Sequence, residues 1–195
     1  MSKLFYVIGP SSSGKDTLYK KIMENNNMDL RPVTTYTTRP IRKGEKEGVE
    51  YHFVDLLEYD RLKSEGKVIE SRVYNTVHGE WKYFTVDDNI YLDKHNYLTI
   101  GVLESYVETV KYFGEDRVIP IYIYVEDGER LQRALNREKI QLIPRYKEMC
   151  RRFIADLDDF SKEKLEKANI KRKFANYNID DCLDEILEYI NYEAR

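Results

Sequence analysis

The sequence lacks the features that mark secreted, metal-binding and membrane proteins. It has only two cysteines, Cys150 and Cys182, without CxxC spacing, which argues against a disulfide framework. Its three histidines, His52, His78 and His95, do not have the spacing of zinc ligands. No apolar run approaches the ~20 residues of a membrane span, and the N-terminus lacks the cleavage site of a secretory signal. We therefore expect a soluble, cytoplasmic protein.

Charge of one sign is not in excess either. The 195 residues contain 32 Lys and Arg against 35 Asp and Glu, a formal net charge of −3, so no nucleic-acid partner is expected. Apolar residues make up 42% of the chain, which is enough for a core and argues against bulk disorder. The length suits one domain that carries small inserted subdomains. Neither a membrane partner nor a particular oligomeric state is indicated.

Short apolar runs alternate with helical patterns along most of the chain. This alternation is typical of an α/β domain in which a parallel sheet is flanked by helices. Buried strands are predicted at residues 4–8, 97–103 and 118–125, and further strands at 33–37 and 172–175. Helices are predicted at 17–23, from 103 through 112, and at 128–137, 145–157 and 180–192.

Residues 38–90 differ from the rest, because their strands are shorter and their turns more polar. A basic loop and a short strand at 51–54 precede a helix that Asp55 caps and Gly66 ends. Two strands, 68–74 and 80–86, and a short helix at 87–93 follow. We interpret 38–90 as a small inserted mixed α+β subdomain, and 1–37 together with 91–195 as the core.

The first loop carries a phosphate-binding motif. Residues 9–15, GPSSSGK, match G-x-x-x-x-G-K between a buried strand and a helix, which is the context that this motif requires. Its glycines let backbone N–H groups converge on an anion, and the start of the helix adds the positive end of its dipole. Lys15 would reach the β- and γ-phosphates; an ordinary turn before a helix is the alternative. The predicted ATP-binding residues of this segment are Gly9, Pro10, Ser11, Ser12, Ser13, Gly14, Lys15, Asp16 and Thr17.

One residue departs from the usual motif. The residue after the lysine is usually Ser or Thr, whose hydroxyl binds Mg²⁺, but here it is Asp16. A carboxylate beside bound phosphates costs Coulomb energy unless a cation lies between them. Asp16 either contacts Mg²⁺ directly or through water, or it only complements the dipole of the first helical turn.

A second segment, residues 34–54, reads TTYTTRPIRKGEKEGVEYHFV and offers two arginines and a tyrosine hydroxyl to a second phosphate. It resembles the nucleotide-binding segment of guanylate kinases, T-T-R-x-x-R-x-G-E-x-x-G-x-x-Y-x-F, and the GPSSSGK loop is similar to the family's GPSGxGK. The matching residues are Thr37, Thr38, Arg39, Arg42, Gly44, Glu45, Gly48, Tyr51 and Phe53.

The resemblance implies the P-loop kinase fold and ATP-dependent phosphate transfer to GMP, giving ADP and GDP, with Mg²⁺. It also implies a core, a GMP-binding region and a helical lid at about 137–150. Glu70 matches the residue that reads the guanine edge, and Asn176 matches an asparagine near the adenine of ATP. The catalytic residues implied are Lys15, Arg39, Arg133, Arg137 and Arg152, with Arg151 as the other candidate for the last. The GMP-binding residues implied are Thr35, Arg39, Arg42, Tyr51, Glu70, Tyr83 and Thr85.

Three segments depart from the family pattern. The family's G-N-Y-Y-G-[ST] is replaced by HGEWKYFT at 78–85, where Tyr83 and Thr85 are the candidate substitutes. The family's I-D-x-x-G strand carries acidic residues, whereas 97–104 contains no Asp, and Asp16 could supply the missing carboxylate. The lid also lacks a glycine after Arg137. Because the triplet GKD resembles ribose 1,5-bisphosphate phosphokinases, a sugar-phosphate acceptor is the alternative, and a non-catalytic binding module is a third possibility.

Overall fold

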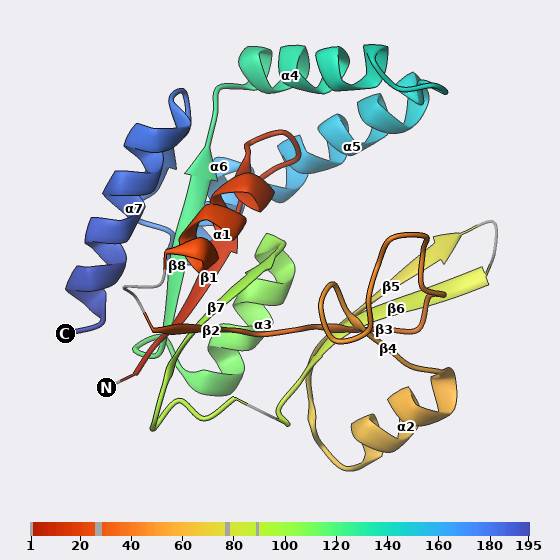
Figure 1. The fold of residues 1–195 in the computed structure, drawn as a ribbon, viewed down its shortest axis with the longest axis vertical. Helices are drawn as coiled ribbons and strands as arrows, with labels where there is room; N and C mark the ends of the chain where they lie inside the picture. Colours follow the sequence, from red (N-terminus) through yellow and green to blue (C-terminus); the bar gives the residue numbers. More distant parts are fainter. Residues whose placement is uncertain (1, 26–28, 77–78, 89) are drawn as a thin grey trace.

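A parallel five-stranded sheet forms the centre of the protein, whose computed structural model describes residues 2–25, 29–76, 79–88 and 90–195. The strand order is β2-β7-β1-β8-β9, and every neighbouring pair is parallel. The predicted α/β fold is therefore confirmed. Figure 1 shows this sheet with helices packed around it. Its strands are β1 (Leu4–Ile8), β2 (Leu30–Pro32), β7 (Asn96–Gly101), β8 (Val118–Tyr124) and β9 (Lys173–Ala175).

Both faces of the main sheet are buried, because β1 directs apolar side chains alternately to each of them. Phe5 and Val7 pack in a cluster with α1 and α7, whereas Tyr6 and Ile8 pack in a second cluster with α3 and with Leu165 of α6. A strand that is buried on both faces needs a continuous apolar run, which explains the sequence LFYVI. These helices are α1 (Lys15–Glu24), α3 (Leu103–Phe113), α6 (Lys162–Lys167) and α7 (Ile179–Glu193).

A second, smaller sheet lies beside the core, at the right of Figure 1. Its strand order is β4-β3-β6-β5, and β6 pairs antiparallel with both β3 and β5. Asp55 starts α2 by accepting a hydrogen bond from Glu58 N (2.8 Å), and Tyr59 of α2 packs on Phe84 of β6. The elements are β3 (Tyr36–Thr37), β4 (His52–Phe53), α2 (Leu56–Ser64), β5 (Val68–Thr76) and β6 (Gly79–Val86).

A hairpin of two helices, α4 (Asp127–Lys139) and α5 (Tyr146–Asp159), projects from the top of the core in Figure 1. The Glu138 carboxylate closes the connection by accepting a hydrogen bond from Arg145 N at 2.8 Å. Pro144 precedes Arg145 and breaks the helical pattern where the sequence predicts a break. No helix among the described residues is long and apolar enough to cross a membrane.

Some predicted elements are wrong. Of the strand predicted at 33–37 only Tyr36–Thr37 is extended, as β3 of the second sheet, whereas β2 of the main sheet was not predicted and ends before it, at Pro32. The helix predicted at 87–93 is absent from the residues described there, which form turns that include Lys94 N to Tyr91 O at 3.0 Å. Helix α6 was not predicted, because so short a helix gives little periodicity. Part of the connection between the strands predicted at 68–74 and 80–86 lies outside the described residues.

Candidate active site

The phosphate-binding motif forms the loop between β1 and α1, and α1 begins at Lys15. Gly9 is required because a Cβ there would lie 2.7 Å from the main-chain oxygen of Ile123. Gly14 has φ +88° and would collide with the amide nitrogen of Asn176 if it carried a side chain. The motif glycines therefore permit a close approach between the loop and the ends of β8 and β9.

Three side chains from distant parts of the chain hold this loop. Asn176 Nδ2 donates to the carbonyl of Ser13 at 2.8 Å, and Arg130 Nη1 donates to the carbonyl of Ser11 at 3.3 Å. Asp156 accepts a hydrogen bond from Ser11 N at 2.9 Å. Arg130 and Asp156, on α4 and α5, were not found from the sequence, because their contacts depend on how the hairpin packs. The loop and the hairpin are thus directly connected.

The loop has the chemistry of an anion site. The hydroxyls of Ser12 and Ser13 are buried and have no hydrogen-bond partner, which is unusual for buried polar atoms. The first N–H groups of α1 have no partner within the helix. Lys15 Nζ lies 3.4 Å from Asp16 Oδ2, with exposures of 18% and 80% for the two side chains. These donors and the lysine fit the phosphates of a nucleotide.

At the phosphate loop, a magnesium ion would have to be held by a single carboxylate together with substrate phosphates and water. Among the described residues, no group of three or more His, Cys, Asp or Glu side chains could hold a metal ion. Mg²⁺ in kinases is commonly held by one or two carboxylates together with substrate phosphates and water. The exposed carboxylate of Asp16, next to Lys15, suits this arrangement.

The second predicted phosphate site lies on the small sheet. Arg39 is only 3% exposed, and its Nε donates to the hydroxyl of Tyr83 at 3.1 Å. Its Nη1 and Nη2 donate to Glu45 at 2.8 and 2.5 Å, and its guanidinium lies over the rings of Tyr51 and Phe53. These contacts bring together three residues that the sequence predicted for one phosphate: Arg39, Tyr51 and Tyr83.

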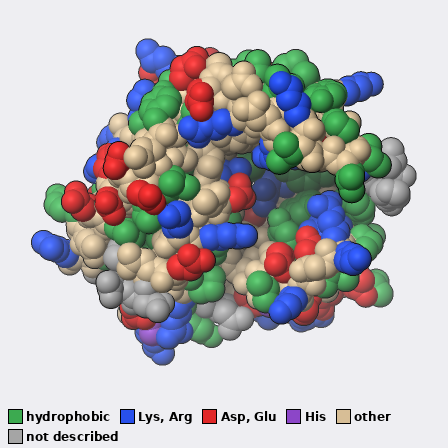
Figure 2. All heavy atoms as spheres, turned by 45° about the horizontal axis from the view of Figure 1, so that its top comes forward, with side chains coloured by type: hydrophobic (Ala, Val, Ile, Leu, Met, Phe, Trp, Pro, Cys, Tyr) green, Lys and Arg blue, Asp and Glu red, His purple; other side chains and the backbone are tan. Residues whose placement is uncertain are grey.

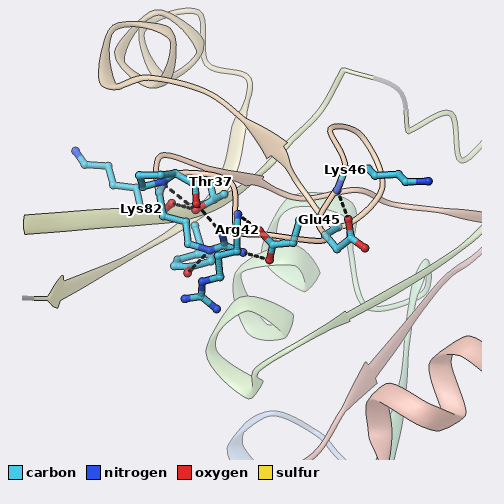
Figure 3. A network of polar contacts seen from close by, with 9 residues as sticks. Thr37, Arg42, Glu45, Lys46 and Lys82 are labelled. Atoms are coloured by element: carbon cyan, nitrogen blue, oxygen red, sulfur yellow. Dashed lines mark hydrogen bonds and ion pairs between the residues drawn. The ribbon is translucent and has the colours of Figure 1, made fainter. Parts of the chain in front are cut away.

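Glu45 organises the loop of this site. Hydrogen bonds from Arg39 lower the pKa of the Glu45 carboxyl to about 2. The same carboxylate accepts from Arg42 N at 2.8 Å, while the Arg42 side chain is exposed. Figure 3 shows these contacts beside those that join the loop to β6, where Thr37 Oγ1 donates to the carbonyl of Lys82 at 2.9 Å. The loop is therefore fixed in shape and leaves Arg42 accessible.

The predicted base-reading residues meet on the same hairpin. Glu70 of β5 and Thr85 of β6 are register partners, and Thr85 Oγ1 donates to Glu70 Oε1 at 2.7 Å. Arg72 and Tyr83 are the next register pair on this face, because side chains alternate along a strand. Arg72 Nε and Nη2 donate to Glu70 Oε2 and Oε1 at 3.0 and 3.3 Å. Sequence analysis did not identify Arg72, although its position two residues after Glu70 was a usable signal.

The other predicted residue near the base, Thr35, precedes β3, and its main-chain oxygen accepts from His52 N at 2.9 Å.

The strand that lacks an Asp, β7, ends at Gly101. A Cβ at Gly101 would lie 2.5 Å from the hydroxyl of Tyr6 and 2.7 Å from Ser105 Oγ. These two hydroxyls are hydrogen-bonded at 2.8 Å and occupy the space that a side chain at position 101 would need.

The predicted lid arginines are on the helical hairpin. Arg133 Nη2 donates to the carbonyl of Asn176 at 3.0 Å, so Arg133 lies close to the phosphate loop. Arg137 and Arg152 line a cavity of about 520 Å³ together with Arg145, which was not predicted. Arg152 lines this cavity, which favours Arg152 over Arg151 as the lid residue of α5. Figure 2 shows a hollow in this face of the molecule with charged side chains on its walls.

Comparisons with known proteins agree with this geometry. The family model "Guanylate kinase" matches residues 1–190. A guanylate kinase from Malacoplasma penetrans is 28% identical over 99% of this chain and 87% of its own length. Guanylate kinases from Anaplasma phagocytophilum and Schizosaccharomyces pombe are 33% and 41% identical, over 65% and 35% of this chain. Those two alignments span 59% and 34% of the relatives' own lengths.

The fold also has a known counterpart. A crystal structure of guanylate kinase from Anaplasma phagocytophilum matches with a TM-score of 0.71 at 23% identity, over 99% of this chain and 86% of that one. This likeness concerns the fold, whereas the match of the family model over nearly the whole chain concerns the sequence. The match of the family model, together with the phosphate loop and the paired residues of the small sheet, shows that the chain belongs to the guanylate kinase family.

Proposed function

We propose that the protein transfers the γ-phosphate of ATP to GMP, giving ADP and GDP. One observation carries the proposal: a hydrogen-bonded pair suited to a base and a hydrogen-bonded pair suited to a phosphate lie next to each other on the small sheet, each with one residue of β6. Glu70 with Thr85 forms the first pair, and Tyr83 with Arg39 forms the second. A nucleoside monophosphate has a base at one end and a phosphate at the other, so these two pairs fit its two ends.

The base-reading end suits guanine. The Glu70 carboxylate accepts hydrogen bonds, and guanine offers two parallel donors, N1–H and the 2-amino group. Adenine lacks that donor pair and would place no matching pair of donors opposite the carboxylate, so it would bind less favourably than guanine. A sugar-phosphate acceptor would not need this carboxylate at all.

The transfer itself needs position and charge more than covalent chemistry. Lys15 and the loop N–H groups would hold the β- and γ-phosphates of ATP, while Arg42, Tyr51 and Arg39 hold the acceptor phosphate in line. Asp16 would hold Mg²⁺, which when bound would neutralise charge between the β- and γ-phosphates. Asn176, which the resemblance places near the adenine of ATP, would also support the loop through its hydrogen bond to Ser13.

We assign residues 38–90 and β3, which together contain the small sheet, to GMP and the hairpin segment at about 137–150 to a lid. The cavity at the hairpin is lined by Arg137, Arg145 and Arg152, whose positive charges suit a phosphate. On closure of the lid, these guanidinium groups and Arg133 would stabilise the charge on the transferring group and exclude water. We also propose that the protein acts in the cytoplasm, where both ATP and GMP are present.

The variant Glu70→Gln tests the assignment of the base site. The amide keeps one acceptor and gains two donors that face the donors of guanine, so kcat/KM for GMP should fall about tenfold or more, while the KM for ATP stays unchanged. Glu58→Gln is the matched control, because Glu58 is on the surface of α2 and pairs with Arg61. An equal loss of activity with every acceptor would contradict the proposal.

A further inference from the structure

The Glu70 carboxylate is already fully engaged within the protein. Its side chain is only 1% exposed, and that of Arg72 is 15% exposed. Both carboxylate oxygens accept from Arg72, and Oε1 also accepts from Thr85. An acceptor base cannot reach a carboxylate that is covered in this way unless a covering side chain moves.

Arg72 binds Glu70 as a guanine base would. Two N–H groups of the guanidinium, on Nε and Nη2, point side by side at the two carboxylate oxygens. The donor edge of guanine has the same chemistry, because N1–H and the 2-amino group are attached to one carbon and form a guanidine unit. Arg72 and guanine therefore make the same kind of two-pronged contact.

Both contacts cannot exist at once. A carboxylate offers about four lone-pair sites, and three are used by Arg72 and Thr85. A guanine edge needs two more, and it needs both oxygens from the same side. Burial lowers the pKa of the Arg72 guanidinium, but the charge of Glu70, the neighbouring hydroxyls of Tyr6 and Tyr74 and the hydrogen bond to Glu70 together outweigh this effect and the pKa is raised, so Arg72 remains a charged competitor.

We propose that Arg72 holds the place of the guanine donor edge on Glu70 until the acceptor binds, and that guanine must displace it. Arg72 is thereby a specificity-determining residue: only a base with two adjacent donors can replace both of its hydrogen bonds. The inference rests on the proposed function, since it takes GMP as the acceptor.

Arg72 also lies next to the phosphate end of the site. Arg72 is the register partner of Tyr83, whose hydroxyl accepts from Arg39 at the phosphate end of the site. The Arg72 side chain thus lies between the base-reading pair and the phosphate-binding pair. A small rotation would direct its charge from Glu70 toward the ribose and phosphate of the acceptor.

The test is the affinity for GMP in two variants, Arg72→Met and Arg72→Lys, measured by titration calorimetry with GMP and by steady-state kinetics with Mg·ATP. Methionine removes the competitor, and lysine keeps the charge but cannot make the two-pronged contact. We expect the Kd for GMP to fall about fivefold or more in both variants, because the fraction of protein with an accessible Glu70 rises. The KM for ATP and the weak binding of AMP should not change.

Arg61→Met is the matched control. Arg61 lies on α2 near the same sheet, is 51% exposed, and pairs with Glu58 and Glu65, so its loss should leave the Kd for GMP unchanged. If the melting temperatures show that only one Arg72 variant folds, the Kd for GMP of that variant alone decides whether the inference holds. A Kd for GMP that is unchanged or higher in a folded Arg72 variant overturns the inference.

The wild-type protein separates this inference from the proposed function. If wild-type protein forms no GDP from GMP and does not bind GMP, the proposed function fails. If wild-type protein uses GMP and the Arg72 variants do not bind it more tightly, only the role of Arg72 fails, and the arginine is a structural part of the hairpin.

Discussion

Asn176 holds the phosphate loop, and its replacement tests how far the loop depends on one buried hydrogen bond. Its Nδ2 donates to the carbonyl of Ser13 at 2.8 Å, and the residue is only 4% exposed. Asn176→Ala would leave a buried carbonyl without this donor, which costs about 1–3 kcal/mol. For a chain of this length, each kcal/mol lowers Tm by about 2–4 °C, so we expect Tm to fall by about 2–12 °C.

The same change should weaken ATP binding. Ser13 is part of the loop that would wrap the phosphates, and its carbonyl is one of the points where the loop is fixed. Without that support we expect the KM for ATP to rise about tenfold, equivalent to about 1.4 kcal/mol. The KM for GMP should change little, because the acceptor residues lie on the second sheet. Steady-state kinetics with each substrate varied in turn measures both values.

Asn178 provides a control for stability, two residues further along the chain. Its Oδ1 accepts from Asp180 N and Asp181 N at 2.9 and 3.4 Å and caps α7. Asn178→Ala should cost about 0.5–2 kcal/mol, lowering Tm without changing the KM for ATP. If Asn176→Ala lowers Tm but leaves the KM for ATP at the wild-type value, the loop does not depend on this hydrogen bond and our reasoning is refuted.

Three further predictions concern charged residues. Lys15→Ala should lower kcat about 10²-fold or more with little change in Tm, because the residue is placed for the transferred phosphate; unchanged turnover would contradict the loop assignment. Asp16→Ser should raise the Mg²⁺ concentration needed for half-maximal rate, and an unchanged requirement would make Asp16 only a helix-start residue. Glu45 has a pKa lowered from 4.5 to about 2 by Arg39, so its stabilisation is present above pH 4.5 and is lost as the pH falls toward 2. Glu45→Gln should remove that part of the pH dependence in acid denaturation; an identical acid profile would contradict it.

The parts that the sequence predicted well are those with local causes. The LFYVI run is buried on both faces, and the loop that follows it has a spacing that only a strand–loop–helix context satisfies. Tyr83 and Thr85 could be proposed as substitutes because they supply the tyrosine and the Ser or Thr of the family's segment, and the structure pairs Thr85 with Glu70.

The parts that it missed depend on contacts between distant segments. Ser11 and Asp156 are 145 residues apart in sequence, and no local pattern indicates that they touch. The burial of Arg39 under Tyr51 and its pairing with Glu45 also follow from how the loop folds over β6. The strand predicted at 33–37 failed because Val33 and Tyr36 belong to the environments of different sheets, although the run contains only β-branched residues and one tyrosine.

The central claim is tested most directly by measuring ADP and phosphorylated product formed from Mg·ATP with GMP, dGMP, AMP, UMP, CMP and ribose 1,5-bisphosphate as separate acceptors. Our account predicts rapid formation of GDP from GMP and almost no turnover with AMP, UMP, CMP or the sugar phosphate. Turnover with ribose 1,5-bisphosphate, or with none of these compounds, would contradict the assignment of Glu70, Thr85 and the small sheet to a guanine nucleotide.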